Sequence, residues 1–366
     1  MAFNASPLII TFFFIIFNFL SSKCSSNGNP TVPAVFVFGD SLVDVGNNNY
    51  LPFSIAKADF PFNGIDFQSK KPTGRFSNGK NAADFLAEKL GLPTSPPYLS
   101  LLLKKSKGSF LNGVNFASGA SGILSGTGLS LGIVIPLTKQ VDYYTTRVYK
   151  DLVQKLGSYG TNKLLSKSLF VTVTGSNDLL SYSRSSGLRK KNTPQQYVDS
   201  MTLTMKTQIK RLYAYGARKF LFPGLANVGC APSQRLKSKA EECNEEVNSL
   251  CAKYNEGLKL MLQQLKSELR DINYSYFDTY TVLQNIIQKP AAYGFTEVKA
   301  ACCGLGKLNA EIPCIPVSTY CSDRSNHVFW DMVHPTEATD RVLVNTIFDN
   351  QSQYIYPLNM RQLIAA

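Results

Sequence analysis

Five short apolar runs, separated by segments with helical periodicity, constrain the fold of this chain more than any other feature. The runs lie at residues 35–38, 110–116, 169–174, 219–222 and 272–277. Runs of this length are typical of buried strands, and strands that alternate with helices form parallel sheets with helices on both faces. The pattern predicts an α/β protein with five parallel strands. Neither an internal repeat nor a linker-like tract divides residues 25–366, so we expect a single domain.

Three helices are predicted between these runs. In the clearest one, Thr193 is the N-cap, Pro194 is the first helical residue and Gly216 ends the helix. The other two cover roughly residues 241–269 and 81–90. Their apolar residues recur at helical spacing, and we assign these stripes to core packing.

The N-terminus predicts a signal peptide over residues 1–24. Residues 8–20 are almost entirely apolar, and small polar residues follow up to Cys24. A membrane span needs about 20 apolar residues, so this run favours a signal peptide over a membrane anchor or a buried helix. No later segment approaches the length of a span without charges. We therefore expect a secreted, extracellular protein without stable membrane insertion.

Secretion would permit disulfide bonds. Seven cysteines follow the predicted signal peptide, so at least one is left without an intrachain partner: Cys230, Cys243, Cys251, Cys302, Cys303, Cys314 and Cys321. Their spacing is not that of a zinc site, and the chain has only two histidines. We expect neither a metal nor another cofactor. Glycosylation sequons occur at Asn273 and Asn350.

The formal net charge of +13 becomes +12 if Lys23 leaves with the signal peptide. Basic residues cluster at 104–107 and 189–191, without the interleaved aromatic residues of single-strand nucleic-acid binders. The charge favours a solvated basic exterior. In a secreted protein, an anionic polysaccharide is the next candidate partner, ahead of nucleic acid.

Two serines are candidate nucleophiles. Ser41 follows the first apolar run after Gly39, which permits the sharp turn of a strand exit. Chemistry in open α/β sheets lies at such strand ends. Ser130 lies in Gly-Leu-Ser-Leu-Gly, which matches a nucleophile elbow, but the Gly- and Ser-rich segment 118–128 replaces the strand that this motif requires. Ser41 is therefore preferred, and Ser130 is the alternative.

A serine nucleophile needs a base, and only His327 and His334 are available. Asp331 precedes His334 by three residues, a spacing that lets a carboxylate reach one ring nitrogen and leaves the other free for a hydroxyl. His327 has Asp323 four residues before it, so spacing alone leaves it open as the base. Its alternative role is a surface residue of a cysteine-rich loop.

Ester chemistry also needs hydrogen-bond donors for an oxyanion. Asn177 follows Gly175 at the end of the third predicted strand and is a candidate side-chain donor. The small residues of segment 113–124 offer backbone N–H groups. The alternatives are a helix N-cap or Asx-turn for Asn177 and a flexible loop for the segment.

These segments together resemble the GDSL esterases and lipases of the SGNH hydrolase superfamily, especially the large plant-type secreted branch. The resemblance covers nearly the whole mature chain, through the motifs FVFGDSLVDVGNNN, NGVNFASGASGI, VTGSND and VFWDMVHPTEA. It implies a flavodoxin-like three-layer α/β/α sandwich with a five-stranded parallel sheet. For a plant protein it implies the cell wall or apoplast.

The resemblance also implies roles for individual residues. Ser41 becomes the nucleophile and, through its own N–H, the first oxyanion donor. Gly119 becomes the second donor and Asn177 the third. His334 becomes the base, and Asp331 orients it.

For the cysteines, the resemblance implies a disulfide between Cys230 and Cys243. Cys251 is then the odd thiol. The pairing of the last four cysteines stays open.

The function that follows is a secreted carboxylic ester hydrolase working through an acyl-enzyme. Lipids, acetylated polysaccharides and small-molecule esters all remain candidate substrates. An acyltransferase would use the same residues, and an extracellular binding protein without turnover is the alternative outside enzymes.

Overall fold

The computed structural model describes residues 31–103 and 109–366 of the chain. The predicted signal peptide and the basic residues 104–107 lie outside the described residues. In the described part, no helix combines the length and the apolar character needed to cross a membrane.

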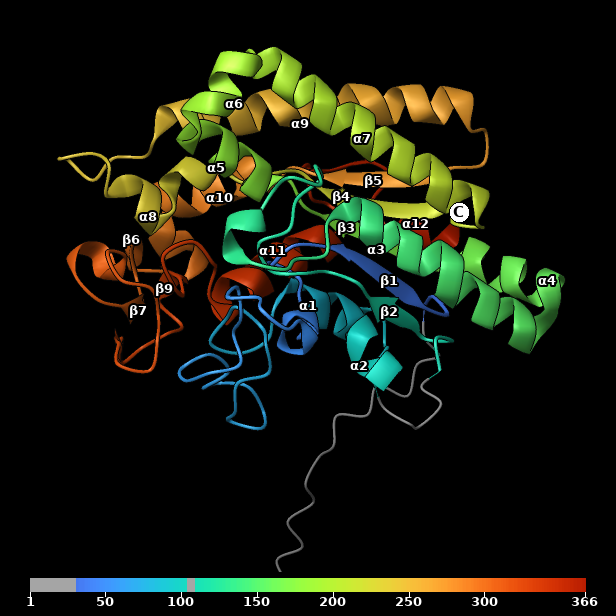
Figure 1. Ribbon diagram of the computed structural model, residues 1–366, viewed down its shortest axis with the longest axis horizontal. Helices are drawn as coiled ribbons and strands as arrows, with labels where there is room; N and C mark the ends of the chain where they lie inside the picture. Colours follow the sequence, from blue (N-terminus) through green and yellow to red (C-terminus); the bar gives the residue numbers. More distant parts are fainter. Residues whose placement is uncertain (1–30, 104–108) are drawn as a thin grey trace, which may run out of the picture.

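The centre of the molecule is a six-stranded sheet with the order β10-β5-β4-β3-β1-β2 (Figure 1). Its strands are β1 (Val35–Gly39), β2 (Gly113–Asn115), β3 (Leu169–Val173), β4 (Lys219–Pro223), β5 (Asn273–Phe277) and β10 (Ile355–Pro357). The strands β1 to β5 run parallel, and β10 pairs antiparallel with β5. The five predicted strands are therefore confirmed, and an edge strand is added to them.

The sixth strand carries no sequence signal of its own. Only Ile355 of its three residues is buried, and Pro357 cannot donate to a ladder. Proline is tolerated there because β10 is an edge strand with one neighbour.

Within residues 31–103 and 109–366, twelve α-helices surround the sheet and the loops at its ends. They are α1 (Ala82–Lys89), α2 (Tyr98–Leu103), α3 (Leu137–Tyr143), α4 (Tyr149–Lys167), α5 (Ser176–Arg184), α6 (Ser186–Lys191), α7 (Pro194–Ala214), α8 (Pro232–Arg235), α9 (Glu245–Glu268), α10 (Thr279–Gln288), α11 (Glu337–Phe348) and α12 (Met360–Ala365). The three predicted helices appear as α1, α7 and α9. Thr193 and Gln196 form a capping box at the start of α7.

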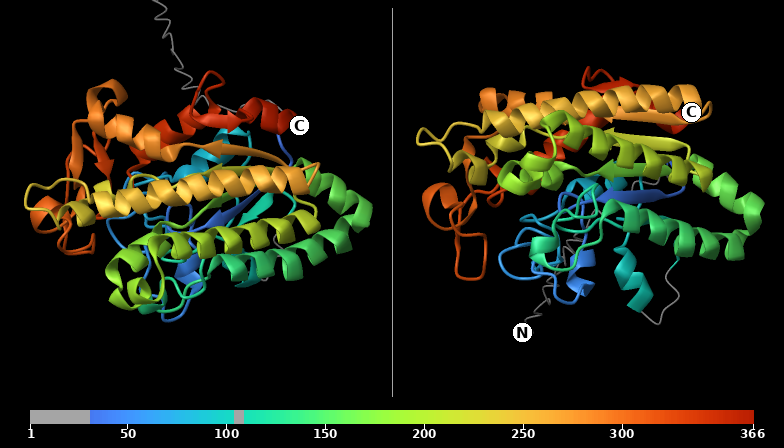
Figure 2. Two further views of the ribbon diagram at one scale, coloured as in Figure 1. Left: turned by 90° about the horizontal axis from the view of Figure 1, so that it is seen from above. Right: turned by 45° about the horizontal axis from the view of Figure 1, so that its top comes forward.

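Two hydrophobic cores cover the two faces of the sheet. Phe36 and Phe38 of β1 pack into one core with residues of α3, α4, α5, α7 and α9. Val35 and Val37 pack into the other with residues of α1, α10, α11 and α12. Successive side chains of a strand point to opposite faces, so a strand buried on both faces is apolar throughout. Figure 2 shows α7 and α9 running side by side on the first face.

Three disulfide bonds lie in the second half of the chain: Cys230–Cys243, Cys302–Cys321 and Cys303–Cys314. The pairing of Cys230 with Cys243 is confirmed, and Cys251 is a free, buried thiol. The last two disulfides staple a loop region with two small sheets, formed by β6 (Glu297–Ala301) with β9 (His327–Phe329) and by β7 (Cys303–Gly304) with β8 (Thr319–Tyr320).

Candidate active site

Ser41 lies two residues after the end of β1, at the carboxyl edge of the parallel strands. The chain leaves the strand at Gly39, where a Cβ atom would lie 2.3 Å from the carbonyl oxygen of Val173 on β3. Only glycine allows this close approach. The Asp40 N–H then donates to the same carbonyl (3.1 Å), which fixes the turn that carries Ser41.

His334 joins Ser41 and Asp331 in one hydrogen-bonded row. The Nε2 of His334 lies 2.8 Å from Ser41 Oγ, and its Nδ1 lies 2.7 Å from Asp331 Oδ2. Each of the three residues is only 9% exposed. An Nδ1–H that donates to a carboxylate leaves Nε2 of the neutral ring as an acceptor for the serine hydroxyl.

The Asp331 carboxylate is held in its ionised form. Burial acts to raise its pKa, but the charge of His334 and hydrogen bonds from His334 and Val333 outweigh burial and lower the pKa. Asp331 Oδ1 accepts the backbone N–H groups of His334 and Val333, each at 2.9 Å. The three-residue spacing therefore forms a tight loop, in which the carboxylate binds both the ring and the backbone of the histidine.

The loop that carries His334 is anchored by Trp330. Trp330 is fully buried, and its Nε1–H donates to Asn63 Oδ1 (3.0 Å). Its backbone N–H donates to the His334 carbonyl (2.8 Å), and its side chain packs against Cys302 and Cys303. The cysteine-rich region thus forms a rigid backing for the loop.

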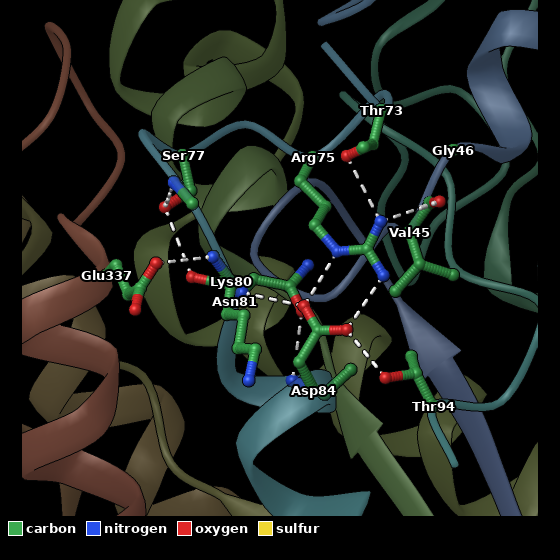
Figure 3. Close-up of polar contacts among 12 residues, drawn as sticks. Val45, Gly46, Thr73, Arg75, Ser77, Lys80, Asn81, Asp84, Thr94 and Glu337 are labelled. Carbon is green, nitrogen blue, oxygen red and sulfur yellow. Dashed lines mark hydrogen bonds and ion pairs between the residues drawn. The ribbon is translucent and has the colours of Figure 1, made fainter. Parts of the chain in front are cut away.

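A second support is the segment that precedes α1. The ring of Phe76 lies 4.9 Å from the His334 ring, centroid to centroid. Beside Phe76, the buried Arg75 guanidinium makes a bidentate ion pair with Asp84 (Figure 3). Glu337, three residues after His334, accepts the N–H of Lys80 at 2.9 Å (Figure 3). The segment therefore binds both the histidine ring and the helix that follows it.

Asn177 lies in the first turn of α5, and Gly175, with φ 124°, directs the chain into that turn. Its Nδ2 donates to the carbonyl of Ser121 at 3.0 Å, which ties it to the glycine-rich loop 118–122. This loop is bound in turn to the end of β1, because Ser118 N–H and Ser121 Oγ–H both donate to the Gly39 carbonyl. In residues 31–103 and 109–366, the N–H of Ser41 finds no acceptor.

Gly119, the second oxyanion donor that the resemblance implies, has an acceptor for its N–H in this structure. Its N–H donates to the buried carboxylate of Asp44 (Oδ2, 3.0 Å) and is therefore not free for an oxyanion. Asp44 Oδ1 also accepts the N–H groups of Gly46 and Asn47, each at 2.7 Å. With three backbone donors, the Asp44 carboxylate holds the loops together. One of these donors is the Gly119 N–H, which the resemblance assigns to the oxyanion.

The next residue, Ala120, presents a backbone donor that is free. Asn48 Nδ2 holds the Gly119 carbonyl at 3.0 Å. Because a trans peptide is planar, the N–H of Ala120 points the opposite way, and it has no acceptor within the described residues. Ala120 adopts φ 64°, in the left-handed region that favours glycine.

Two buried carboxyl groups of the site were missed from the sequence. Asp178 accepts the N–H groups of Ile123 and Leu124 and the Thr127 hydroxyl, which fastens loop 121–127 to α5. Asp40 adjoins Ser41, and burial raises its pKa to about 7. One oxygen of Asp40 accepts the Leu42 N–H, and the other has no partner among the described atoms. Their positions in the sequence could have indicated them, because Asp40 precedes Ser41 and Asp178 follows Asn177.

The alternative serine and histidine lie elsewhere. Ser130 is exposed in a 3₁₀ turn (Leu129–Leu131) without a preceding strand. His327 lies on β9, where its Nδ1 contacts the Asp323 carbonyl and Asn326 Oδ1. In the described part of the chain, no three His, Cys, Asp or Glu side chains are grouped so that they could hold a metal ion.

In this α/β/α sandwich, the carboxyl end of β1 presents Ser41, and the loop between β9 and α11 brings His334 and Asp331 into one hydrogen-bonded row with it. The chain belongs to the GDSL-like lipase/acylhydrolase family, whose sequence profile matches residues 35–347. It is a carboxylic ester hydrolase.

Similar proteins support this assignment. One GDSL esterase/lipase of Arabidopsis thaliana is 52% identical over 342 residues, which cover 92% of this chain and 90% of the relative. Another from the same plant is 40% identical over 354 residues, with 94% of each chain covered. An acetylxylan esterase structure from Geobacillus stearothermophilus aligns at a TM-score of 0.37 and 11% identity over 85% of this chain and 90% of that chain. That last likeness is too low to carry an argument.

Proposed function

We propose that the protein is a secreted ester hydrolase that works through an acyl-enzyme on Ser41. The observation that carries the proposal is the 2.8 Å contact between Ser41 Oγ and His334 Nε2, with the opposite nitrogen held by Asp331. A hydroxyl in this position can transfer its proton to the ring as it attacks a carbonyl carbon.

The reaction follows in two halves. His334 takes the Ser41 proton, Ser41 Oγ bonds to the ester carbonyl carbon, and the tetrahedral intermediate collapses as His334 protonates the departing alcohol. A water molecule, deprotonated by His334, then attacks the acyl-enzyme and releases the acid. Asp331 stabilises the imidazolium that forms in each half. Every step uses protein groups and water, so the proposed mechanism requires no cofactor.

Three donors are proposed for the oxyanion. Two are those expected from the sequence, the Ser41 N–H and the Asn177 side-chain amide. For the third, we replace Gly119 by Ala120, because the N–H of Gly119 is bound to Asp44 and that of Ala120 is free. Donors fixed in advance stabilise charge in the transition state without reorganising.

Secretion is supported by the apolar N-terminal run and by three disulfides, which persist in oxidising compartments. We propose an extracellular location, in a plant the cell wall or apoplast, where the positive net charge suits contact with an anionic polysaccharide. Glycosylation at Asn273 and Asn350 belongs to the same proposal.

The test is hydrolysis of p-nitrophenyl esters from acetate to palmitate by the secreted protein. We expect Ser41→Ala to abolish hydrolysis and Ser130→Ala, the matched control, to leave it unchanged. Activity that survives in Ser41→Ala but not in Ser130→Ala would reverse the assignment. Formation of a new ester when an alcohol competes with water would favour an acyltransferase. A folded wild type that binds wall polysaccharide and hydrolyses no ester of the series would favour a binding protein.

A further inference from the structure

Exposed apolar side chains gather on two loops of this protein. Sixteen large hydrophobic residues are exposed in the described part of the chain, and five of them lie in segments 51–56 and 129–133: Phe53, Ile55, Leu129, Leu131 and Ile133. Phe53 is 85% exposed and Ile55 is 70% exposed. We call these five residues the apolar rim. Contiguous exposed apolar surface in a soluble protein marks an interaction site.

The two loops form one surface because their backbones are in contact. The N–H of Ile55 donates to the carbonyl of Leu131 at 3.0 Å. A Cβ atom on Gly132 would lie 2.0 Å from the Phe53 carbonyl oxygen, so glycine is needed for the loops to approach this closely. The apolar rim is therefore a single patch, although its two parts are more than seventy residues apart in the chain.

The apolar rim borders the candidate active site. Asn48 Nδ2 donates both to the carbonyl of Ala56, next to Ile55, and to that of Gly119. At the other loop, a Cβ atom on Gly128 would lie 2.1 Å from the Ala120 carbonyl oxygen. Both loops thus adjoin the residues beside the proposed oxyanion donors.

The composition of the loops indicates what they contact. Neither segment 51–56 nor segment 124–138 contains an ionisable residue, and the next residues in the chain are Lys57 and Lys139. Specific protein interfaces surround apolar residues with polar partners and match a complementary shape. A phenylalanine that is 85% exposed projects from the surface instead of lining a groove. Projecting apolar side chains can enter the fluid acyl chains of a lipid aggregate, while lysines beside them contact its polar surface.

We propose that the apolar rim seats the enzyme on the surface of an aggregated acyl ester, at a lipid–water interface, and brings acyl chains from that phase to Ser41. This inference rests on the proposed ester hydrolysis and adds to it a substrate class, lipid esters in aggregates. Transfer of projecting apolar side chains out of water supplies the affinity, and contact between the rim and the Ala120 loop places the interface beside the nucleophile.

The first test measures binding without catalysis. In the Ser41→Ala background, the protein should float with phosphatidylcholine vesicles that contain dioleoylglycerol. Replacing both Phe53 and Leu129 by Ser should weaken this binding by at least about tenfold. The control replaces Leu203 and Leu260, similarly exposed residues of α7 and α9, by Ser and should bind like the parent. No flotation of the parent, or equal loss in the control, would overturn the inference.

The second test measures rate with the active enzyme. As tributyrin passes its solubility limit, the wild-type rate should rise more steeply than in proportion to concentration, and F53S/L129S should lose this rise while it still hydrolyses dissolved p-nitrophenyl acetate. Equal losses on dissolved and emulsified ester would contradict the inference. Absence of all hydrolysis would count against the proposed function alone, because flotation is measured on an inactive variant.

Discussion

Asp44 and Gly119, 75 residues apart in the chain, are joined by a buried hydrogen bond from the Gly119 N–H to Asp44 Oδ2. The bond fixes the loop that passes Ser41, and it engages the backbone donor that the sequence resemblance assigns to the oxyanion. The motif that presents Ser41 therefore also shapes the neighbouring loop 118–122, through Asp44 and Asn48.

Asp331→Asn should lower kcat by roughly 10³- to 10⁴-fold. The asparagine oxygen can still accept the N–H groups of Val333 and His334, so the loop should stay folded. Its NH₂ group then faces His334 Nδ1 and forces the proton onto Nε2, which can no longer accept the Ser41 proton. Ester hydrolysis and thermal unfolding together check this. A loss below about tenfold in a folded variant would exclude Asp331 as the orienting residue.

Asn177→Ala should lower kcat about 10²- to 10³-fold with little change in KM, because the lost donor acts on the transition state. The variant also loses the hydrogen bond to Ser121, so its melting temperature is measured alongside. A kcat near that of wild type in folded Asn177→Ala would remove Asn177 from the oxyanion site.

Ala120→Gly should raise the free energy of unfolding by about 0.5–1 kcal/mol, since relief of the left-handed conformation exceeds the entropy cost of glycine. The same change at Ala252, exposed within α9, should lower it by about 1 kcal/mol. Urea unfolding of the two variants provides the comparison. Destabilisation by both changes would mean that φ at Ala120 is not strained in solution.

Asp40→Asn should gain stability relative to wild type as pH rises from about 4 to 7. Burial raises the folded-state pKa of Asp40 from 3.8 to about 7, so in this window the folded state binds the proton that the unfolded state releases. Wild-type stability from this group is complete below pH 4 and is lost as pH rises, by at most about 1.4 kcal/mol per pH unit. Unfolding free energies of both proteins at several pH values give the difference. A difference independent of pH would contradict the burial of a titrating carboxyl.

Asp84→Asn should lower the free energy of unfolding by about 3–5 kcal/mol, because it leaves the buried Arg75 guanidinium without its counter-charge. The control is Glu256→Gln, which breaks an exposed pair with Lys259 and should change stability by less than about 1 kcal/mol. Chemical unfolding measures both. Similar small losses would show that the Arg75–Asp84 pair does not anchor the segment beside His334.

Much of the fold could be predicted because its signals are local. The strands β1, β3 and β4 are mostly apolar, because both faces of the sheet are covered. The strands β2 and β5 contain the polar residues Asn115, Asn273 and Ser275, but each lies next to aromatic residues that mark the run. The start of helix α7 could be predicted from Thr193, the N-cap, and Pro194, the first helical residue, because both stabilise the first turn locally. β10 has no such local signal, since only one of its three side chains is buried. These residues form a strand because they pair with β5 at the edge of the sheet.

The sequence by itself determined which residue types are available for the chemistry: one serine after a strand, two histidines, and an aspartate three residues before one of them. The tertiary structure alone brought His334 to Ser41 across 293 positions, committed the Gly119 N–H to Asp44 and joined two distant loops in the apolar rim. The physical reason is that periodicity and capping act between neighbours in the chain. Which donor meets which acceptor across the fold depends on packing that no local pattern records.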